Sequence, residues 1–240
     1  MAVDVALMRR ARQTGEAVFR VYSWSAPTLS FGRNQTAMGR YNLDRIRAMG
    51  VDVVRRPTGG RAILHWREVT YSVTAPASDG IGVKQSYTRI NQILLDGLGR
   101  LGVAVEVATP TARTHRPTDA PCFVTPSEGE MTTNGQKLVG SAQWRDGDAL
   151  LQHGSILVED DQTLLASLMV HPPPEGSTRV GTLHEALGRK PEPEEIAAAM
   201  FQAVRGREDP VAAQLDVGDV IRLGEESTAL FLDDRWTWRR

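Results

Sequence analysis

The sequence predicts an α/β fold in a single domain, and three observations support this prediction. Apolar residues recur at helical intervals in several segments, most clearly from Ser86 to Leu101. Other segments alternate apolar and polar residues as half-buried strands do, and an Asp-Gly pair at 146–147 joins two of them as a tight hairpin turn would. The chain has 240 residues, of which 41% are hydrophobic, so it can bury a substantial core.

The order of the elements follows from periodicity and from turn residues. We expect helices at 3–14, 43–49, 86–101 and 192–206, a short apolar helix near 164–170, and strands at 19–24, 70–75, 103–108, 137–144 and 150–158. Two further strands should meet at the glycines of 55–61. The segment 109–121 has three prolines and almost no apolar residue, which predicts a loop leading into Cys122. Residues 162–240 are more helical, and we expect them to complete the same domain, 1–240.

Composition excludes several classes of function. Lys and Arg number 28 against 29 Asp and Glu, so the chain lacks the basic excess of a protein that tracks nucleic acid. No apolar run approaches the roughly 20 residues that span a bilayer, and the N-terminus lacks a signal-peptide core, so we expect a cytoplasmic protein without membrane segments. One cysteine forms no internal disulfide, and no Cys/His cluster has metal-ligand spacing.

The segment RRPTGGR contains the first candidate site residues, Arg56, Gly59, Gly60 and Arg61. Paired glycines allow a ligand to approach the backbone closely, and arginines hold anionic or polar groups. The alternative is a hairpin turn with a solvated rim. Arg55, Arg56, Arg61 and Arg67 together suggest a basic cluster that steers acidic partners, although a solvated arginine rim is an equal alternative.

Lys137 begins an alternating strand and is followed by the small residues Gly140, Ser141 and Ala142. A lysine at the start of a strand is usually a solvent-exposed residue with no role in a site. Here the small residues leave room for a ligand against the sheet, which favours an inward-pointing lysine at a binding site.

Cys122 and His153 each have a structural and a functional interpretation. A lone cysteine is more often a small buried hydrophobe than a nucleophile, but Cys122 follows a polar loop, where exposure is expected. A nearby ammonium such as that of Lys137 would lower the pKa of the thiol and favour the thiolate. His153 lies in an apolar strand, where it is either a hydrogen-bonded structural residue or a site residue, and Gly154 after it suggests a close approach to the backbone.

Six segments in order, TLSFGRNQ, RRPTGGRAILH, TYSV, PCF, GQKLVGSAQ and LLQHGSILVEDD, span residues 28–161. Together they resemble the lipoate/octanoate protein transferase and ligase superfamily, whose catalytic domain is related to that of biotin protein ligases. The resemblance implies a mostly antiparallel sheet flanked by helices. It also implies that Lys137 lies at the acyl-binding site. The implied substrate-binding residues are Arg56, Gly59, Gly60, Arg61, His65, Gly140, Ser141, Ala142, His153 and Gly154.

Within the superfamily the chain looks most like the cysteine-dependent octanoyltransferases of the LipM type. Ligases usually carry a third glycine where this chain has Arg61, and they commonly add a C-terminal domain for which 162–240 is too short. Cys122 stands where these transferases have their cysteine. The chain departs from the family at Gly129, since an aromatic residue often precedes the Glu-hydrophobic pair that Glu130 begins here.

The implied reaction transfers octanoyl from octanoyl-acyl carrier protein to a lysine of lipoyl domains, either of 2-oxoacid dehydrogenase E2 subunits or of the glycine cleavage H protein. Cys122 and Lys137 would be catalytic, through a thioester on Cys122, with no cofactor and no metal, in a monomer. Three alternatives stay open: an ATP-dependent lipoate-protein ligase, an amidotransferase between lipoyl-bearing proteins, and a non-catalytic acyl-binding relative. An acyl chain needs an apolar tunnel, for which we expect a lining drawn from Ile63, Leu138, Val139, Leu151 and Ile156.

Overall fold

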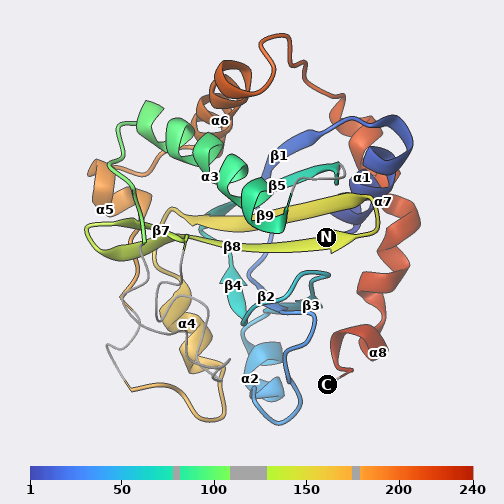
Figure 1. Cartoon of the computed structure of the whole chain (residues 1–240). Helices are drawn as coiled ribbons and strands as arrows, with labels where there is room; N and C mark the ends of the chain where they lie inside the picture. The colour runs from blue at the N-terminus through green and yellow to red at the C-terminus, as the bar shows by residue number, and fades with distance from the viewer. Residues whose placement is uncertain (78–81, 109–128, 175–178, 240) are drawn as a thin grey trace.

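The computed structural model describes residues 1–77, 82–108, 129–174 and 179–239 (Figure 1). Its main sheet has six strands, in the order β1 (Val18–Tyr22), β5 (Glu68–Pro76), β9 (Ala149–Leu157), β8 (Gln136–Asp146), β7 (Met131–Thr133) and β6 (Glu106–Val107). A second sheet has the order β3 (Asp52–Arg55), β2 (Thr28–Phe31) and β4 (Ile63–His65). The helices are α1 (Ala2–Thr14), α2 (Leu43–Ala48), α3 (Val83–Arg100), α4 (Gln162–Ser167), α5 (Leu183–Leu187), α6 (Pro193–Arg207), α7 (Val217–Leu232) and α8 (Asp234–Thr237).

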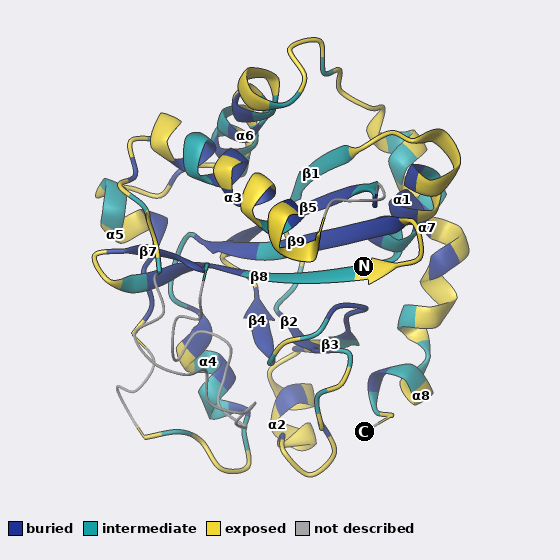
Figure 2. Ribbon diagram, in the orientation of Figure 1, coloured by how far each residue is buried: buried dark blue, intermediate teal, exposed yellow. Residues whose placement is uncertain are grey.

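The expected fold class is confirmed. All neighbouring strands of the main sheet pair antiparallel, and among the described strands the one parallel pair, β2 with β3, lies in the small sheet. Helices α3 and α6 cover one face of the main sheet, and the small sheet lies on its other side with α4 (Figure 1). We call these the α3 face and the glycine-loop face, after the loop 56–61 that joins β3 to β4. The central strands β5 and β9 are buried between these layers (Figure 2).

The predicted hairpin at the glycines is wrong. Strands β3 and β4 do not pair with each other, because β2 lies between them, parallel to β3 and antiparallel to β4. The glycine loop therefore crosses over the end of β2 instead of turning tightly. By contrast, the Asp-Gly hairpin between β8 and β9 is confirmed, and Gly147 has the positive φ of 55° that favours glycine there.

Most of the expected helices and strands are present, with shifted ends. The strand expected at 103–108 is reduced to the two exposed residues of β6 at the sheet edge. Helix α7 was not predicted from the periodicity of apolar residues. It packs along α1 where Gly224 removes a side chain: a Cβ at this position would lie 2.6 Å from Cγ2 of Val3. Among the described helices, none combines the length and the apolar character that crossing a membrane requires.

The expected basic cluster does not form, since two of its arginines are structural. Arg55 is fully buried and donates to the carbonyls of Gly32 at 2.7 Å and Gln35 at 2.8 Å. Arg56 is 5% exposed and braces the glycine loop. Arg67 is bound to Asp161 through a hydrogen bond of 2.7 Å from its Nε to Oδ1. The steering interpretation is therefore wrong for Arg55 and Arg56, whose guanidinium groups are buried. The Arg67 side chain is 48% exposed, and steering by this residue stays a prediction.

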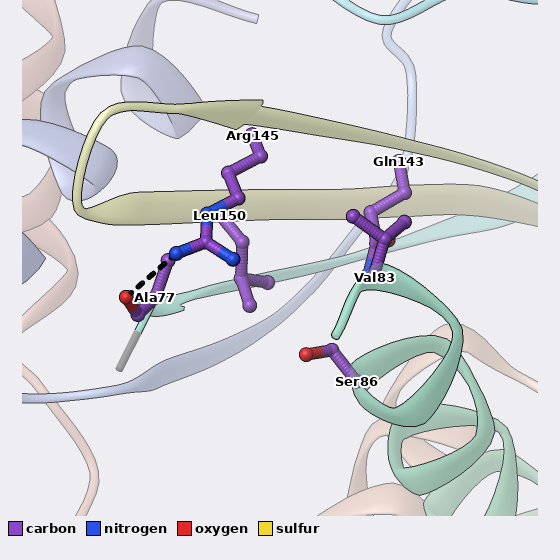
Figure 3. A pocket seen from close by; sticks show the side chains of 6 residues that line it. All are labelled: Ala77, Val83, Ser86, Gln143, Arg145 and Leu150. Atoms are coloured by element: carbon purple, nitrogen blue, oxygen red, sulfur yellow. Dashed lines mark hydrogen bonds between the residues drawn. The ribbon is translucent and has the colours of Figure 1, made fainter. Parts of the chain in front are cut away.

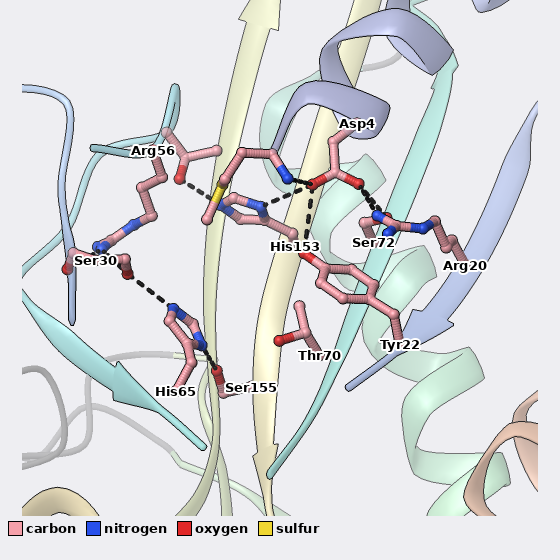
Figure 4. Close-up of polar contacts among 12 residues, drawn as sticks. Asp4, Arg20, Tyr22, Ser30, Arg56, His65, Thr70, Ser72, His153 and Ser155 are labelled. Atoms are coloured by element: carbon pink, nitrogen blue, oxygen red, sulfur yellow. Dashed lines mark hydrogen bonds and ion pairs between the residues drawn. The ribbon is translucent and has the colours of Figure 1, made fainter. Parts of the chain in front are cut away.

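A buried carboxylate joins α1 to the glycine-loop face (Figure 4). Asp4 is wholly buried, and its Oδ1 accepts hydrogen bonds from Arg20 and Ser72, both at 2.8 Å. Nδ1 of His153 lies 3.8 Å from its Oδ2. Burial alone would raise the pKa of Asp4, but the amino group of Met1, the nearby ring of His153 and the charge of Arg20 together hold that pKa below its ordinary value. The network fixes α1 against β5 and β9.

We expect Asp4→Asn to lower the free energy of unfolding by about 3 kcal/mol at pH 7, because the change removes one partner of a buried charge network. The folded-state pKa of Asp4 lies below the unfolded value of about 3.9, so its contribution is complete above that pH and declines as the pH falls. Urea unfolding of both proteins from pH 6 to pH 3 should show the difference shrinking. Asp44→Asn, at an exposed position paired with Arg47, is the control and should change little. A difference that stays constant over this pH range would contradict the assignment.

Candidate functional site

A β-bulge in β8 decides which way Lys137 points. Thr132 of β7 is the cross-strand partner of Lys137, whereas Met131 is the partner of Val139, which leaves Leu138 as an extra residue. Cross-strand partners share a face, and neighbouring residues of β7 point to opposite faces. The bulge therefore places Lys137 on the face opposite Val139, which is the glycine-loop face.

Lys137 is buried as a charge, with a carboxylate as its partner. Its side chain is 1% exposed, and Nζ lies 2.6 Å from Oε1 of Glu130, whose side chain is 9% exposed. The expectation that Lys137 points inward is confirmed. A buried ammonium is tolerated in a folded protein when it is paired and hydrogen-bonded, as here.

Gly60 in the loop and Gly32 after β2 each have a packing reason to be glycine, whereas a Cβ at Gly59 would meet no atom within 4 Å. A Cβ at Gly60 would lie 2.7 Å from Nη2 of Arg56, and its φ is 96°. A Cβ at Gly32, which follows β2, would lie 1.9 Å from the carbonyl oxygen of Gly60. The Arg56 guanidinium donates to the carbonyls of Gly59 at 2.9 Å and Arg61 at 2.6 Å. The loop is thus held rigidly against β2 by backbone contact and by one arginine.

His153 connects this loop to the main sheet. Its Nε2 lies 2.6 Å from Oγ1 of Thr58, in the loop, and its other ring nitrogen faces Asp4 (Figure 4). Burial lowers the pKa of His153, and the Asp4 carboxylate opposes this effect. Cross-strand neighbours on β8 are Ala142 for His153 and Gly140 for Ser155, so these small residues lie on the same face.

His65 belongs to a second buried cluster on this face. Its Nε2 lies 2.8 Å from Oγ of Ser30, and its Nδ1 lies 3.0 Å from Oε1 of Glu68. This is the hydrogen-bond order of a Ser-His-acid triad, but Ser30 is fully buried and its oxygen also accepts from Arg56. The cluster fastens β2 and β4 to β5, and its serine is not accessible to a substrate.

Ser141 and Gly154 face the α3 side instead. The hydroxyl of Tyr71 lies 2.6 Å from Oγ of Ser141 and accepts a hydrogen bond of 3.0 Å from Gln152. Burial raises the pKa of Tyr71 above its ordinary value, against the effect of these two hydrogen bonds. A Cβ at Gly154 would lie 2.7 Å from the Tyr71 ring, so this glycine makes room for the ring. The side-chain positions of Ser141 and Gly154 are therefore turned away from Lys137.

The ring of Tyr87 lies beside Gly129, the position at which this chain has no aromatic residue. Gly129 has a φ of 83°, and a Cβ there would lie 3.2 Å from Cε1 of Tyr87 on α3. The family often has an aromatic residue at this position, and here an aromatic ring from α3 lies beside it. Burial and the charge of Glu130 raise the pKa of Tyr87.

Cys122 lies outside the described residues, as does the whole segment 109–128. The two described ends next to that segment are joined. The amide of Ala108 donates to the carbonyl of Glu130 at 2.8 Å, and the amide of Gly129 donates to the carbonyl of Ala108 at 3.1 Å. Ala108 and Gly129, the described residues on either side of that segment, thus lie beside the backbone of Glu130, whose carboxylate pairs with Lys137.

The apolar residues expected to line one tunnel do not form a single surface. They are distributed over separate buried clusters: Leu138, Val139 and Ile156 in one, Ile63 in a second, and Leu151 in a third. Each cluster packs on different elements. At most a subset of the five can contact one acyl chain.

A small hollow lies on the α3 face, between the first turn of α3 and the β8–β9 hairpin (Figure 3). Its volume is about 10 Å³, which is room for one water molecule. Arg145 closes it by donating to the carbonyl of Ala77 at 3.1 Å. The other lining residues are Val83, Ser86, Gln143 and Leu150. Its size does not fit an acyl chain.

The structure thus gathers most of the predicted residues on one face. The glycine-loop face has Lys137, the loop with Arg56, Gly59, Gly60 and Arg61, and the side chains of His65, His153 and Ala142, with Gly140 beside them. Three residues of this arrangement were missed by sequence reasoning: Glu130, Asp4 and Tyr87. An acidic residue directly before a strand next to the lysine strand was a usable signal for Glu130. For Asp4 and Tyr87 the usable signal was helical spacing, because Asp4 stands three residues before the buried Leu7 and Tyr87 three residues before the buried Ile90.

Comparisons with known proteins show which family the chain belongs to. The lipoyl protein ligase A/B catalytic domain family matches residues 1–205. An octanoyltransferase LipM of Kyrpidia tusciae is 36% identical over an alignment of 262 positions, which covers 100% of this chain and 94% of that protein. Octanoyltransferase LipM of Carboxydothermus hydrogenoformans is 44% identical over 166 residues, which is 67% of this chain and 61% of that protein.

The fold is also that of a solved lipoate enzyme. A putative lipoate protein ligase from T. acidophilum with bound lipoic acid has a TM-score of 0.81 at 18% identity, covering 100% of this chain and 92% of that one. At this low identity the structural similarity supports the fold alone. Together with the family match over most of the chain, it identifies the chain as a member of the lipoyl protein ligase A/B catalytic domain family.

Proposed function

We propose that this chain is an octanoyltransferase of protein lipoylation that works through a thioester on Cys122. The observation that carries this proposal is the identity to octanoyltransferases of the LipM type along the full length of the chain. The buried Lys137 ammonium on the glycine-loop face supports it, because acyl transfer between thiol and amine needs a group that gives and takes protons.

In the first step, the Cys122 thiolate attacks the thioester carbonyl of octanoyl-acyl carrier protein. The bond from the carbonyl carbon to Cys122 forms, the bond to the carrier thiol breaks, and the leaving thiolate takes a proton from the Lys137 ammonium. In the second step, a lysine amine of a lipoyl domain attacks the new thioester. The C–N bond forms, the C–S bond to Cys122 breaks, and the proton lost by the amine returns to Lys137. No ATP is needed, since the donor is already a thioester.

Chain length permits Cys122 to work beside Lys137. Cys122 lies seven positions before Gly129, and a chain of this length spans at most about 25 Å. Gly129 adjoins Glu130, which contacts Lys137 directly. Backbone amides of Gly59 and Gly60, held by Arg56, are candidates to stabilise the oxyanion that forms in each step.

Residues 1–240 form one domain in this proposal, and the enzyme works as a monomer. The contacts that support the single domain come from the C-terminal helices. Trp236 donates through Nε1 to the carbonyl of Arg55 at 2.8 Å, and Arg55 donates to the carbonyl of Thr237 at 2.9 Å. The acceptors we propose are lipoyl domains of 2-oxoacid dehydrogenase E2 subunits or the glycine cleavage H protein.

The direct test is the intact mass of the protein after mixing with octanoyl-acyl carrier protein without ATP. We expect an adduct of one octanoyl group that hydroxylamine releases, because a thioester is labile to this nucleophile. The adduct should be absent from Cys122→Ser. Cys122 is the only cysteine of the chain, so no second thiol complicates the assignment.

A different result would establish the ligase alternative. If a lipoyl domain were modified only with ATP and free acid, and Cys122→Ala retained that activity, Cys122 would be a packing residue. If the protein bound octanoate but modified no carrier under any donor, the non-catalytic interpretation would stand.

The close packing of the glycine loop against Gly32 gives a second prediction. Gly32→Ala places a Cβ against the carbonyl of Gly60 and must displace the loop, so we expect the transfer rate to fall by about a hundredfold. Gly99→Ala is the matched control, since its Cβ would meet nothing within 4 Å on α3, and its rate should be unchanged. Steady-state transfer to a lipoyl domain measures both, and a wild-type rate in Gly32→Ala would contradict a role for the loop.

A further inference from the structure

The ion pair between Lys137 and Glu130 is more costly than a structural contact requires. Both side chains are at least nine-tenths buried, and the two charged atoms lie 2.6 Å apart. Desolvating two charges costs several kcal/mol, and well-packed apolar residues of similar volume often serve stability equally well. The pair therefore calls for an explanation beyond folding.

Backbone hydrogen bonds fix Glu130 on both sides. Its carbonyl accepts from the amide of Ala108 at 2.8 Å, and the carbonyl of Gly129 before it accepts from Nδ2 of Asn91 at 2.8 Å. Gly129 in turn packs against the ring of Tyr87. The carboxylate is held by its backbone, so it can hold the longer and more flexible lysine in one place.

The bulge in β8 completes the arrangement. It turns Lys137 to the glycine-loop face. There Nζ meets the carboxylate of Glu130, the residue directly before β7. The Nζ atom is thereby presented to the face on which the glycine loop, Gly140 and Ala142 lie.

We propose that Glu130 is a positioning residue for Lys137: it holds the lysine in place and favours its return to the ammonium form in the second half-reaction. This inference rests on the proposed octanoyl transfer. In the first half-reaction Lys137 gives its proton to the leaving carrier thiolate. The neutral amine then leaves the Glu130 carboxylate as a buried charge without an ammonium partner, which is unfavourable. The second half-reaction removes this cost, because Lys137 recovers a proton from the attacking lysine amine.

The test is the rate of Cys122 acylation in single turnover, followed by intact mass from pH 6 to pH 10. In Glu130→Gln we expect a rate about a hundredfold below wild type at the alkaline end. We also expect the alkaline limb to begin at lower pH, because an ammonium without its carboxylate partner gives up its proton more readily. Toward pH 6 the loss should become smaller, and what remains there is the effect of the misplaced lysine. Glu106→Gln, the same change at an exposed position of β6, should match wild type throughout.

The possible results distinguish a failure of the proposed function from a failure of the inference about Glu130. If wild type forms no adduct on Cys122, the proposed function itself fails. If wild type forms it and Glu130→Gln has the same rate and profile, the inference about Glu130 is overturned. An equal loss at every pH overturns it as well, since that result indicates a merely structural role.

A second variant covers the case in which Glu130→Gln does not fold, as judged by its thermal unfolding. Glu130→Asp keeps the charge but shortens the side chain by one methylene. We expect a lower acylation rate with an alkaline limb close to that of wild type, because the carboxylate is still present. A rate equal to wild type, or a limb displaced by a full pH unit or more, would contradict the proposal.

Discussion

The buried ammonium of Lys137 determines which groups the glycine-loop face of the main sheet must contain. A lysine that is 1% exposed needs a carboxylate, and Glu130 supplies it at 2.6 Å. That carboxylate needs a fixed backbone, which the hydrogen bonds among Ala108, Gly129 and Asn91 provide. The lysine needs a bulge to reach the correct face, and β8 has one at Leu138. Each feature follows from placing one positive charge inside the protein.

The two faces of the main sheet do different work. The α3 face contains the largest apolar cluster and the buried Tyr71–Ser141–Gln152 hydrogen bonds. The glycine-loop face contains the charged and ring-nitrogen groups, namely Lys137 with Glu130 and His153 with Asp4. Polar groups in a low-dielectric interior are rigid when they are satisfied, which is what a site for acyl transfer requires. The separation lets the α3 face provide stability while the other face provides chemistry.

Much of this was predictable from the sequence, because the signals were local. The hairpin at Gly147, helix α3 and the inward lysine followed from turn chemistry, period and small neighbours. The order of the small sheet was not predictable, since β2 pairs with strands that follow it by a crossover that no local signal marks. Ser141 and Gly154 were assigned to the pocket as parts of motifs, yet strand alternation turns both to the other face. Arg55 and Arg56 looked like a charged rim because sequence does not show which carbonyls will surround a guanidinium.

The proposed mechanism requires that the octanoyl thioester on Cys122 forms and also passes its octanoyl group to the acceptor lysine. The most direct measurement isolates the octanoyl-enzyme, mixes it with a lipoyl domain without any donor, and follows the octanoyl group over time. We predict that the group leaves Cys122 and appears on the lipoyl-domain lysine at a rate no slower than steady-state turnover. An adduct that forms but transfers more slowly than turnover, or not at all, would contradict transfer through Cys122.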